Sequence, residues 1–366
     1  MRHLITGGAG FIGSHLAEAL LARGDEVQII DNLATGSMDN VAHLKGKPGF
    51  SYVIDTLLNE SLLAELVDGA DRIHHLAAAV GVQRIIKSPV QTIEVNTRGT
   101  EVVLQHAAKK EKRVLFASTS EVYGKSTQLP FSEDGDIVLG TPQRGRWSYA
   151  CSKALDEFLC IAYWRERSVP TTVLRLFNTV GPRQVATYGM VLPTFVRQAL
   201  SGQPITVFGN GEQTRCFSSI HDVIRCWLAI SDTERSVGGI YNVGSTQEIS
   251  IAELAAVVKE VTGSQSQILR VPYETAYESG FEDMPRRVPD LQRLRAAVGF
   301  APETPVREIV EEVVQGLDTP DRGRKKASIP TPPTTPALAP WRIARRPTKP
   351  PIITPRSATS VSHHPA

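Results

Sequence analysis

The stretch TGGAGFIGSHL, Thr6–Leu16, decides the fold. It follows a short apolar segment that is typical of a buried strand, and it leads into a helical pattern over 14–24. Gly7, Gly10 and Gly13 stand three residues apart at this junction. Glycines at such spacing let the chain turn sharply and bring backbone amides close to an anion at the helix N-terminus. The stretch therefore predicts a strand, a phosphate-binding turn and a helix.

Short apolar runs alternate with helical patterns through the first half of the chain. Strands are predicted over 2–7, 26–31, 51–55, 72–78, 113–119 and 171–178, and helices over 14–24, 92–110 and 148–167. This alternation predicts an α/β fold with a doubly wound parallel sheet. We expect residues 1–180 to form this domain, with later insertions from the C-terminal part, and residues 181–318 to form a smaller α/β substrate-binding region.

The charge of the 366-residue chain is unevenly distributed. Residues 319–366 carry nine Lys or Arg against one acidic residue, and eleven prolines, whereas residues 1–318 carry 31 basic and 37 acidic residues. A segment so rich in proline and charge is expected to be a disordered basic tail. It lacks the interleaved aromatic residues of single-strand binders, so we expect it to be a solubilising appendage and expect no nucleic-acid partner.

The four cysteines, Cys151, Cys160, Cys216 and Cys226, do not form a CxxC pair or a zinc-ligand spacing. This usage predicts reduced thiols and a cytoplasmic location. The sequence begins directly with a strand-like segment and has no apolar run of membrane-spanning length, so we expect neither a leader nor a membrane span. No cluster of metal-ligand residues is evident, and His74 and His75 are expected to be core residues.

An acidic residue follows the glycine-rich turn at the distance expected for a dinucleotide site. Asp31 ends the second strand, 18 residues after Gly13, where its carboxylate can accept hydrogen bonds from a ribose diol. The same charge repels a 2′-phosphate and so favours NAD over NADP. Asp55, after the third strand, is placed to reach the adenine amino group or to serve as an ordinary loop acid. The alternative to a dinucleotide site is a tight strand-to-helix turn in which Gly7, Gly10 and Gly13 are needed only for close packing.

Tyr149 and Lys153 lie four residues apart in SYACSKALDEFL. On a helix this spacing puts both side chains on one face, one turn apart. A nearby ammonium favours the phenolate and is expected to lower the tyrosine pKa towards neutrality. Such a tyrosine can take a proton from a sugar hydroxyl while hydride leaves the same carbon. The alternative is an amphipathic helix with a core tyrosine and a surface lysine.

Several motifs occur in a characteristic order: the glycine motif, HLAA at 75–78, Asn96, the Thr before VYG, YxxxK and RLFNTVGPR. In this the chain resembles the nucleotide-sugar epimerases, dehydratases and decarboxylases of the extended short-chain dehydrogenase/reductase family, over about residues 1–315. The resemblance implies a Rossmann-type domain, bound NAD that returns to its starting state, and a UDP-sugar substrate. It implies cofactor contacts from Gly7, Gly10, Phe11, Ile12, Gly13, Asp31, Asn32, Asp55, Leu76, Ala77, Asn96, Tyr149 and Lys153.

The resemblance also assigns the substrate side of the site. Thr119 matches the residue that binds the sugar O4 beside Tyr149. Asn178, Arg215 and Arg287 match residues that contact the substrate, and the two arginines are expected to bind its diphosphate. Phe208 is expected to lie near the nucleobase. Each arginine could instead form a surface salt bridge.

The segment Thr119–Ser120–Glu121 bears on the choice of reaction. Dehydratases of the dTDP-glucose type often carry Asp where Ser120 stands. Glu121 and Arg287 of this chain match two groups that lie near the substrate carboxylate in UDP-glucuronate decarboxylases. Those decarboxylases also carry a Ser/Pro-rich loop after HLA, whereas this chain has AAVGVQRIIKSP there. The sequence alone therefore favours a UDP-sugar 4-epimerase over a decarboxylase, with a 4,6-dehydratase third. Glu121 could also be a purely structural carboxylate.

Two further expectations concern catalysis and assembly. A non-catalytic NAD-binding sensor on the same fold is the rival class, but such proteins typically lose the Tyr or the Lys, and both are present here. By resemblance, the helices over 92–110 and 148–167 are expected to pair with those of a second copy and form a homodimer.

Overall fold

The computed structural model describes residues 1–81, 88–186, 190–272, 284 and 286–318. The predicted tail, 319–366, lies outside the described residues. Within the described ranges no helix is long and apolar enough to cross a membrane.

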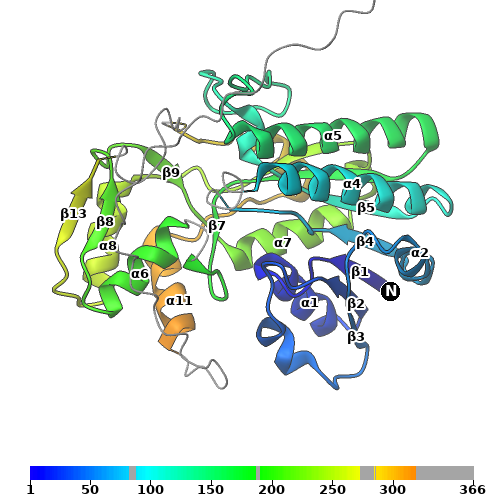
Figure 1. Cartoon of the computed structure of the whole chain (residues 1–366), viewed down its shortest axis with the longest axis horizontal. Helices are drawn as coiled ribbons and strands as arrows, with labels where there is room; N and C mark the ends of the chain where they lie inside the picture. Colours follow the sequence, from blue (N-terminus) through cyan, green and yellow to red (C-terminus); the bar gives the residue numbers. More distant parts are fainter. Residues whose placement is uncertain (82–87, 187–189, 273–283, 285, 319–366) are drawn as a thin grey trace, which may run out of the picture. The chain divides into compact units, whose positions relative to one another are not determined.

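A seven-stranded sheet forms the centre of the described chain (Figure 1). All of its neighbouring strands run parallel, in the order β11-β6-β5-β4-β1-β2-β3. The strands are β1 (Arg2–Thr6), β2 (Glu26–Asp31), β3 (Phe50–Ile54), β4 (Arg72–His75), β5 (Arg113–Thr119), β6 (Thr171–Leu176) and β11 (Ile240–Val243). The doubly wound α/β fold is therefore confirmed. The fourth strand ends three residues earlier than predicted, so Leu76 to Ala78 lie in the loop at the carboxyl edge of the sheet.

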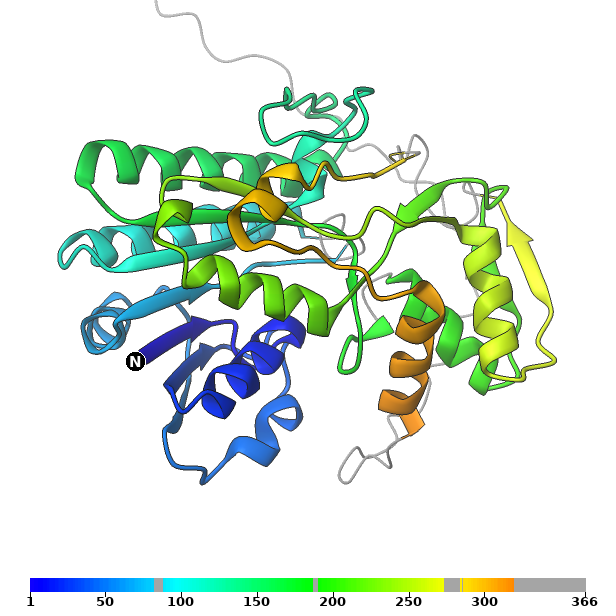
Figure 2. The ribbon, with the colours of Figure 1, turned by 180° about the vertical axis from the view of Figure 1, so that it is seen from behind.

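Helices cover both faces of the sheet. On one side lie α2 (Glu60–Gly69), α4 (Pro89–Ala108) and α5 (Trp147–Arg167); on the other lie α1 (Phe11–Ala22), α7 (Ile220–Ser231) and α10 (Gln292–Val298). Figure 2 turns the view of Figure 1 by 180°, so that the face with α1 and α7 is towards the viewer. Helix α7, strand β11 and helix α10 come from the C-terminal part of the chain.

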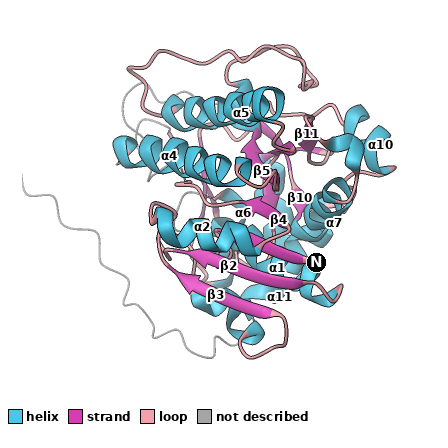
Figure 3. Ribbon diagram, turned by 90° about the vertical axis from the view of Figure 1, so that its right-hand side faces the viewer, coloured by secondary structure: helices cyan, strands magenta, loops and turns pink. Residues whose placement is uncertain are grey.

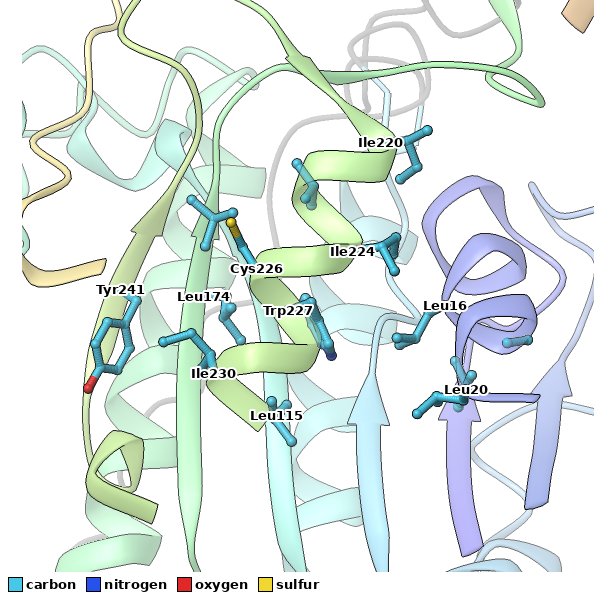
Figure 4. Packing of buried hydrophobic residues seen from close by; sticks show 14 of the residues in the cluster. Leu16, Leu20, Leu115, Leu174, Ile220, Ile224, Cys226, Trp227, Ile230 and Tyr241 are labelled. Carbon is cyan, nitrogen blue, oxygen red and sulfur yellow. The ribbon is translucent and has the colours of Figure 1, made fainter. Parts of the chain in front are cut away.

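Helix α7 is amphipathic, and its apolar face packs on the sheet (Figure 4). Ile220, Ile224 and Trp227 point towards α1 and the central strands and belong to one buried cluster with Leu16. Trp227 is fully buried, and its indole Nε1 donates a hydrogen bond to Nδ1 of His74 at 2.9 Å. A helix far along the chain thus closes the layer that supports the glycine-rich turn.

The rest of the chain after β6 builds a smaller region with its own core. Its elements are β7 (Thr179–Val180), α6 (Val191–Leu200), β8 (Ile205–Phe208), β9 (Thr214–Cys216), β10 (Ser218–Ser219), β12 (Glu248–Ser250), α8 (Ile251–Val261), β13 (Ile268–Val271) and α11 (Val306–Asp318). Two-stranded sheets join β8 to β13 and β9 to β12. Helices α6, α8 and α11 share one apolar cluster with β8. The domain boundaries themselves stay a prediction.

Short 3-10 helices complete the description: η1 (Met38–Leu44), η2 (Ser120–Tyr123) and η4 (Glu234–Ser236). Of these, η2 directly follows β5. It places Ser120 and Glu121 at the carboxyl edge of the sheet, where open parallel sheets bind their ligands.

Candidate active site

The glycine-rich turn is packed so closely that larger residues cannot replace its glycines. A β-carbon on Gly7 would lie 2.8 Å from the backbone nitrogen of Ala77, and one on Gly13 would collide with the Gly7 carbonyl oxygen. Gly7 also has φ +73°, a conformation that side chains disfavour. Gly10 stands before the first turn of α1, whose first two residues are Phe11 and Ile12. The turn therefore leaves a bare backbone surface at a helix N-terminus, which suits a pyrophosphate.

Asp31 faces this turn from the end of β2. Its Oδ2 accepts a hydrogen bond from the Ala9 amide at 3.0 Å and its Oδ1 accepts one from the Leu33 amide at 2.8 Å. The pKa of the carboxyl group is raised, because the effect of burial exceeds the lowering effect of these two amides. The neighbouring Asn32 is exposed and accepts a bond from the Ala34 amide. The carboxylate is thus held beside the turn, as the dinucleotide prediction requires.

The remaining predicted cofactor residues lie along the same edge. Leu76 and Ala77 follow β4, and the Leu76 amide donates to the Thr6 carbonyl at 3.1 Å. Asn96, buried on α4, accepts from the Ala79 amide at 2.7 Å. Asp55 has both oxygens engaged, by the amide of Thr56 at 2.6 Å and the side chain of Asn59 at 2.9 Å. Asp55 therefore organises the turn before α2, and its adenine contact stays a prediction.

Thr119 and Tyr149 meet at the end of β5. Thr119 caps η2 by accepting a bond from the Glu121 amide at 3.2 Å. Its hydroxyl also lies close enough to the Tyr149 phenol to lower the pKa of that phenol. The structure thus brings together the two residues that sequence reasoning placed at the sugar O4.

The electrostatics of Tyr149 correct one expectation. Burial raises the pKa of the phenol above its usual range, the negative charge of Glu121 raises it further, and the neighbouring Thr119 hydroxyl lowers it. Lys153, also buried, has its ammonium 3.7 Å from Oδ2 of Asp156 and 3.8 Å from the centre of the Phe116 ring. The expectation that Lys153 lowers the tyrosine pKa is not met in this arrangement: burial and Glu121 raise the pKa of the phenol, and the Lys153 ammonium lies against Asp156.

Glu121 and Arg287 form an ion pair across the site. Arg287 Nη1 lies 3.4 Å from Glu121 Oε1, and the arginine side chain is only 9% exposed. The segment around Arg287 is fastened on both sides: Arg286 Nη2 pairs with Glu248 on β12 at 2.6 Å, and the Val288 carbonyl accepts from the Phe131 amide at 2.8 Å. The arginine is therefore fixed in place from two parts of the fold.

The three other predicted substrate residues lie in the smaller region. Asn178, just after β6, donates from Nδ2 to the Cys216 carbonyl at 3.2 Å. Arg215, the neighbour of Cys216 on β9, is buried and donates to the Thr214 carbonyl at 2.7 Å. Phe208 ends β8. The structure thus joins Asn178 to the strand that carries Arg215.

Sequence reasoning missed a buried network directly behind Thr119. Ser118 Oγ donates to Glu157 Oε1 at 2.5 Å, and Arg175 on β6 pairs with Glu157 Oε2 at 2.7 Å. Arg175 also lies over the Tyr123 ring, 4.7 Å from its centre. Glu157 stands four residues after Lys153, so helical spacing could have pointed to it. The described residues hold no group of three or more His, Cys, Asp or Glu placed to bind a metal.

Comparison with known proteins places this site in a family. Residues 4–313 match the family model described as GDP-mannose 4,6 dehydratase. The chain is 43% identical over 315 residues to UDP-N-acetyl-alpha-D-glucosaminuronate decarboxylase of Bacillus cytotoxicus, covering 86% of this chain and 97% of that protein. It is 36% identical over 316 residues to UDP-glucuronic acid decarboxylase 1 of Xenopus tropicalis, covering 86% and 71%.

A solved structure shows the same architecture. The UDP-glucuronic acid 4-epimerase from Bacillus cereus, crystallised with UDP-glucuronic acid and NAD, is 27% identical and superimposes with a TM-score of 0.78 over 87% of this chain and 99% of that one. The fold and the site together define an enzyme of the nucleotide-sugar group of extended short-chain dehydrogenases/reductases. The chain belongs to the GDP-mannose 4,6-dehydratase family within that group.

Proposed function

We propose that the protein is an NAD-using enzyme that decarboxylates a UDP-hexuronate through a 4-keto-sugar. The observation that carries the proposal is the contact between Glu121 and a buried Arg287 beside Thr119 and Tyr149. Decarboxylases that are 43% and 36% identical to this chain support it. This shifts the preference away from the 4-epimerase favoured by the sequence alone.

The described residues fit NAD. The turn of Gly7, Gly10 and Gly13 suits the pyrophosphate, and the Asp31 carboxylate suits an unphosphorylated adenosine ribose. The other residues proposed to contact the cofactor are Phe11, Ile12, Asn32, Asp55, Leu76, Ala77, Asn96, Tyr149 and Lys153. When bound, NAD accepts a hydride from the sugar and later returns it.

Tyr149 and Thr119 handle the proton at O4 of the sugar. We assign Tyr149 as the base that takes the O4 proton as the C4 ketone forms. Thr119 orients the same oxygen, consistent with its hydroxyl lying near the phenol. Lys153 supplies positive charge one helical turn away.

The C4 ketone makes a C6 carboxylate a β-keto acid. The C5–C6 bond breaks, CO2 leaves, and the electron pair passes into the C4–C5 enolate, whose charge rests on O4 beside Thr119 and Tyr149. A proton then returns to C5 and the ketone is reduced. Arg287 binds the carboxylate with its guanidinium fork, while Glu121 holds the arginine in orientation.

The smaller region binds the nucleotide end of the substrate in this proposal. Arg215 pairs with diphosphate oxygens, and Asn178, tied to the same strand through Cys216, contacts the substrate next to it. Phe208 lies towards the base. UDP is the nucleotide we propose, in line with the decarboxylases that resemble this chain.

Variants of the ion pair test the proposal. Glu121→Gln and Arg287→Lys should still oxidise the sugar but release CO2 about a hundredfold more slowly, so that absorbance of reduced NAD accumulates. Arg295→Lys is the matched control, because this side chain, eight residues after Arg287, is exposed and pairs with the exposed Glu303. Normal CO2 release by both site variants would overturn the proposal, as would absence of CO2 from the wild type.

A 4-epimerase is the second candidate, favoured by the likeness to the Bacillus cereus UDP-glucuronic acid 4-epimerase. The loop that replaces the Ser/Pro-rich segment of decarboxylases also favoured it, but residues 82–87 of that loop lie outside the described residues. An epimerase would invert C4 of UDP-glucuronate and keep its carboxylate. Product identification therefore separates the two candidates.

We also propose a homodimer formed through α4 and α5. These helices pack side by side on one face of the sheet (Figure 3). Their outer surface exposes four large apolar side chains, Val90, Ile93, Leu155 and Phe158, the last of them 68% exposed. An apolar stripe of this kind on two neighbouring helices suits burial against the same helices of a second copy.

A cytoplasmic location remains part of the proposal. All four cysteines are free thiols, and Cys160, Cys216 and Cys226 are buried. Free thiols are the usual state in a reducing compartment. Localisation of a tagged full-length chain tests this.

A further inference from the structure

A second carboxylate lies against Lys153 on the inner face of α5. Asp156 Oδ2 is 3.7 Å from Lys153 Nζ, and the two side chains are 0% and 3% exposed. The lysine ammonium also sits over the Phe116 ring, at 3.8 Å from its centre. The charge of Lys153 is therefore held away from water by one anion and one aromatic face.

Burial works against both charges. It lowers the pKa of Lys153, and the negative charge of Asp156 is the largest effect that opposes this. Burial also raises the pKa of Asp156 to about 6, against the lowering effects of Lys153 and of the neighbouring Thr100 hydroxyl. Each charge therefore depends on the other, because an isolated buried ion tends to become neutral.

The other titratable groups around Lys153 are engaged or uncharged. Glu157 on α5 is held by Ser118 and Arg175. Burial raises the pKa of the Cys160 thiol, so it stays protonated, and burial lowers the pKa of His75 on β4 to about 3, so it stays neutral. In the described part of the chain, Asp156 is thus the carboxylate next to Lys153 that has no arginine partner.

Polar side chains next to Asp156 continue towards the phosphate-binding turn. The hydroxyl of Thr100 on α4 is near enough to lower the pKa of Asp156, and it lies 3.1 Å from Nε2 of His75. Nδ1 of His75 is 2.7 Å from the hydroxyl of Thr6, the residue before Gly7. Both carboxylate oxygens of Asp156 are buried and have no hydrogen-bond partner in the described part of the chain, so Lys153 is the cation that faces them.

We propose that Asp156 is a positioning residue that keeps Lys153 charged and fixed on the inner face of α5, one turn from Tyr149. It acts through Lys153 and does not touch the substrate. The inference rests on the proposed function, in which Tyr149 is the base and Lys153 its cationic partner.

Asp156→Asn removes the charge with little change in shape. We expect the alkaline limb of the kcat–pH profile to move about one unit towards lower pH, and kcat above that limb to fall about tenfold, with KM for the nucleotide-sugar and the NAD content unchanged. Asp156→Glu, which restores a carboxylate, should move the limb back. Asp232→Asn is the control. It removes a carboxylate that pairs with Arg72 at the start of β4, at the amino ends of the strands, and it should leave the kcat–pH profile unchanged.

A second readout does not depend on turnover. In lysine-labelled full-length protein, the nitrogen NMR signal of Lys153, assigned by its loss in Lys153→Met, should titrate at lower pH in Asp156→Asn than in the wild type. An unchanged titration together with an unchanged kcat–pH profile would overturn the inference. A wild-type rate in Tyr149→Phe would instead refute the proposed function while leaving the lysine titration interpretable.

Folding of the variants gives a third comparison. Asp156→Asn alone leaves a buried lysine without its counter-ion, whereas Lys153→Met/Asp156→Asn removes both charges. The double variant should therefore unfold at a higher urea concentration than Asp156→Asn, even if the single variant folds poorly. A double variant no more stable than Asp156→Asn would contradict the pairing.

Discussion

Arg175 and Glu157 form a buried ion pair. Arg175 Nη2 lies 2.7 Å from Oε2 of Glu157, and Arg175 Nε lies 3.0 Å from Oε1 and 3.2 Å from Oε2. The two side chains are 3% and 4% exposed. Because Glu157 also accepts the hydroxyl of Ser118, this pair fixes the end of β5 against α5. The positions of Thr119 and Tyr149 relative to each other follow from it.

Removing one partner of this pair should destabilise the fold strongly. Glu157→Gln leaves a buried guanidinium without its anion, and we expect the free energy of unfolding to fall by about 3–5 kcal/mol. Urea unfolding followed by circular dichroism measures this. Glu166→Gln, on an exposed position of the same helix, should change stability by less than about 0.5 kcal/mol. Equal effects of the two variants would refute the structural role of Glu157.

Tyr149 should be needed for chemistry and not for cofactor retention. Tyr149→Phe removes the phenolic hydroxyl beside Thr119, and we expect kcat to fall about 10²- to 10⁴-fold. The bound NAD, measured after denaturing the purified protein, should stay at the wild-type level. Tyr163→Phe on the same helix, where the ring packs under Arg167, is the matched control and should keep wild-type turnover. A sensor would show no loss of function with Tyr149→Phe.

Buried histidines should make the fold sensitive to acid. Burial lowers the pKa of His3 and His15 to about 4 and of His75 to about 3, and it lowers that of His74 well below its usual value. The unfolded chain binds these protons near pH 6.5 and the folded chain does not, so stability is complete above pH 6.5 and is lost as the pH falls towards 4. Each such histidine contributes a slope of up to about 1.4 kcal/mol per pH unit.

Urea midpoints at pH 7.5, 6 and 5 measure this loss. Asp156 acts in the opposite direction below about pH 6, because its raised pKa favours proton uptake by the folded state. The net loss should still be clear, since four histidines oppose it. A midpoint that rises on acidification would contradict the account.

The exposed apolar stripe on α4 and α5 should mediate dimer formation. Phe158→Asp places a charge at the most exposed of its four apolar side chains and should convert the dimer to a monomer, as measured by light scattering coupled to gel filtration. Leu269→Asp, at a half-exposed apolar position on β13, is the control and should leave the dimer intact. A wild-type monomer would refute the proposed dimer.

The sheet and the cofactor edge could be predicted from local sequence, because strand and helix periods and the Gly7–Gly13 spacing are local signals. The sequence did not indicate that β11 pairs with β6; it indicated only that some later segment would join the sheet. A four-residue strand gives a weak local signal, and its pairing depends on residues far away in the chain. The contact of Glu121 with Arg287 spans 166 residues, and resemblance, not periodicity, pointed to it.

The charges around Lys153 show where sequence reasoning stopped. Asp156 and Glu157 lie three and four residues after Lys153, so helical spacing places both near it. Which acid pairs with which cation depends on Arg175, which arrives from β6 and takes Glu157. That choice leaves Asp156 to Lys153. The tyrosine pKa departs from the simple lysine–phenol expectation because burial of the phenol is the largest effect on it.

The central claim is that the enzyme removes C6 of a UDP-hexuronate. The most direct test supplies the full-length protein and NAD with UDP-glucuronate, or with the uronate of UDP-N-acetylglucosamine, labelled with ¹³C at C6, and follows the label by carbon NMR. The account predicts that the label leaves as carbon dioxide and bicarbonate while a UDP-pentose-type product appears. Label retained in a 4-epimerised UDP-hexuronate would contradict decarboxylation and establish the epimerase instead.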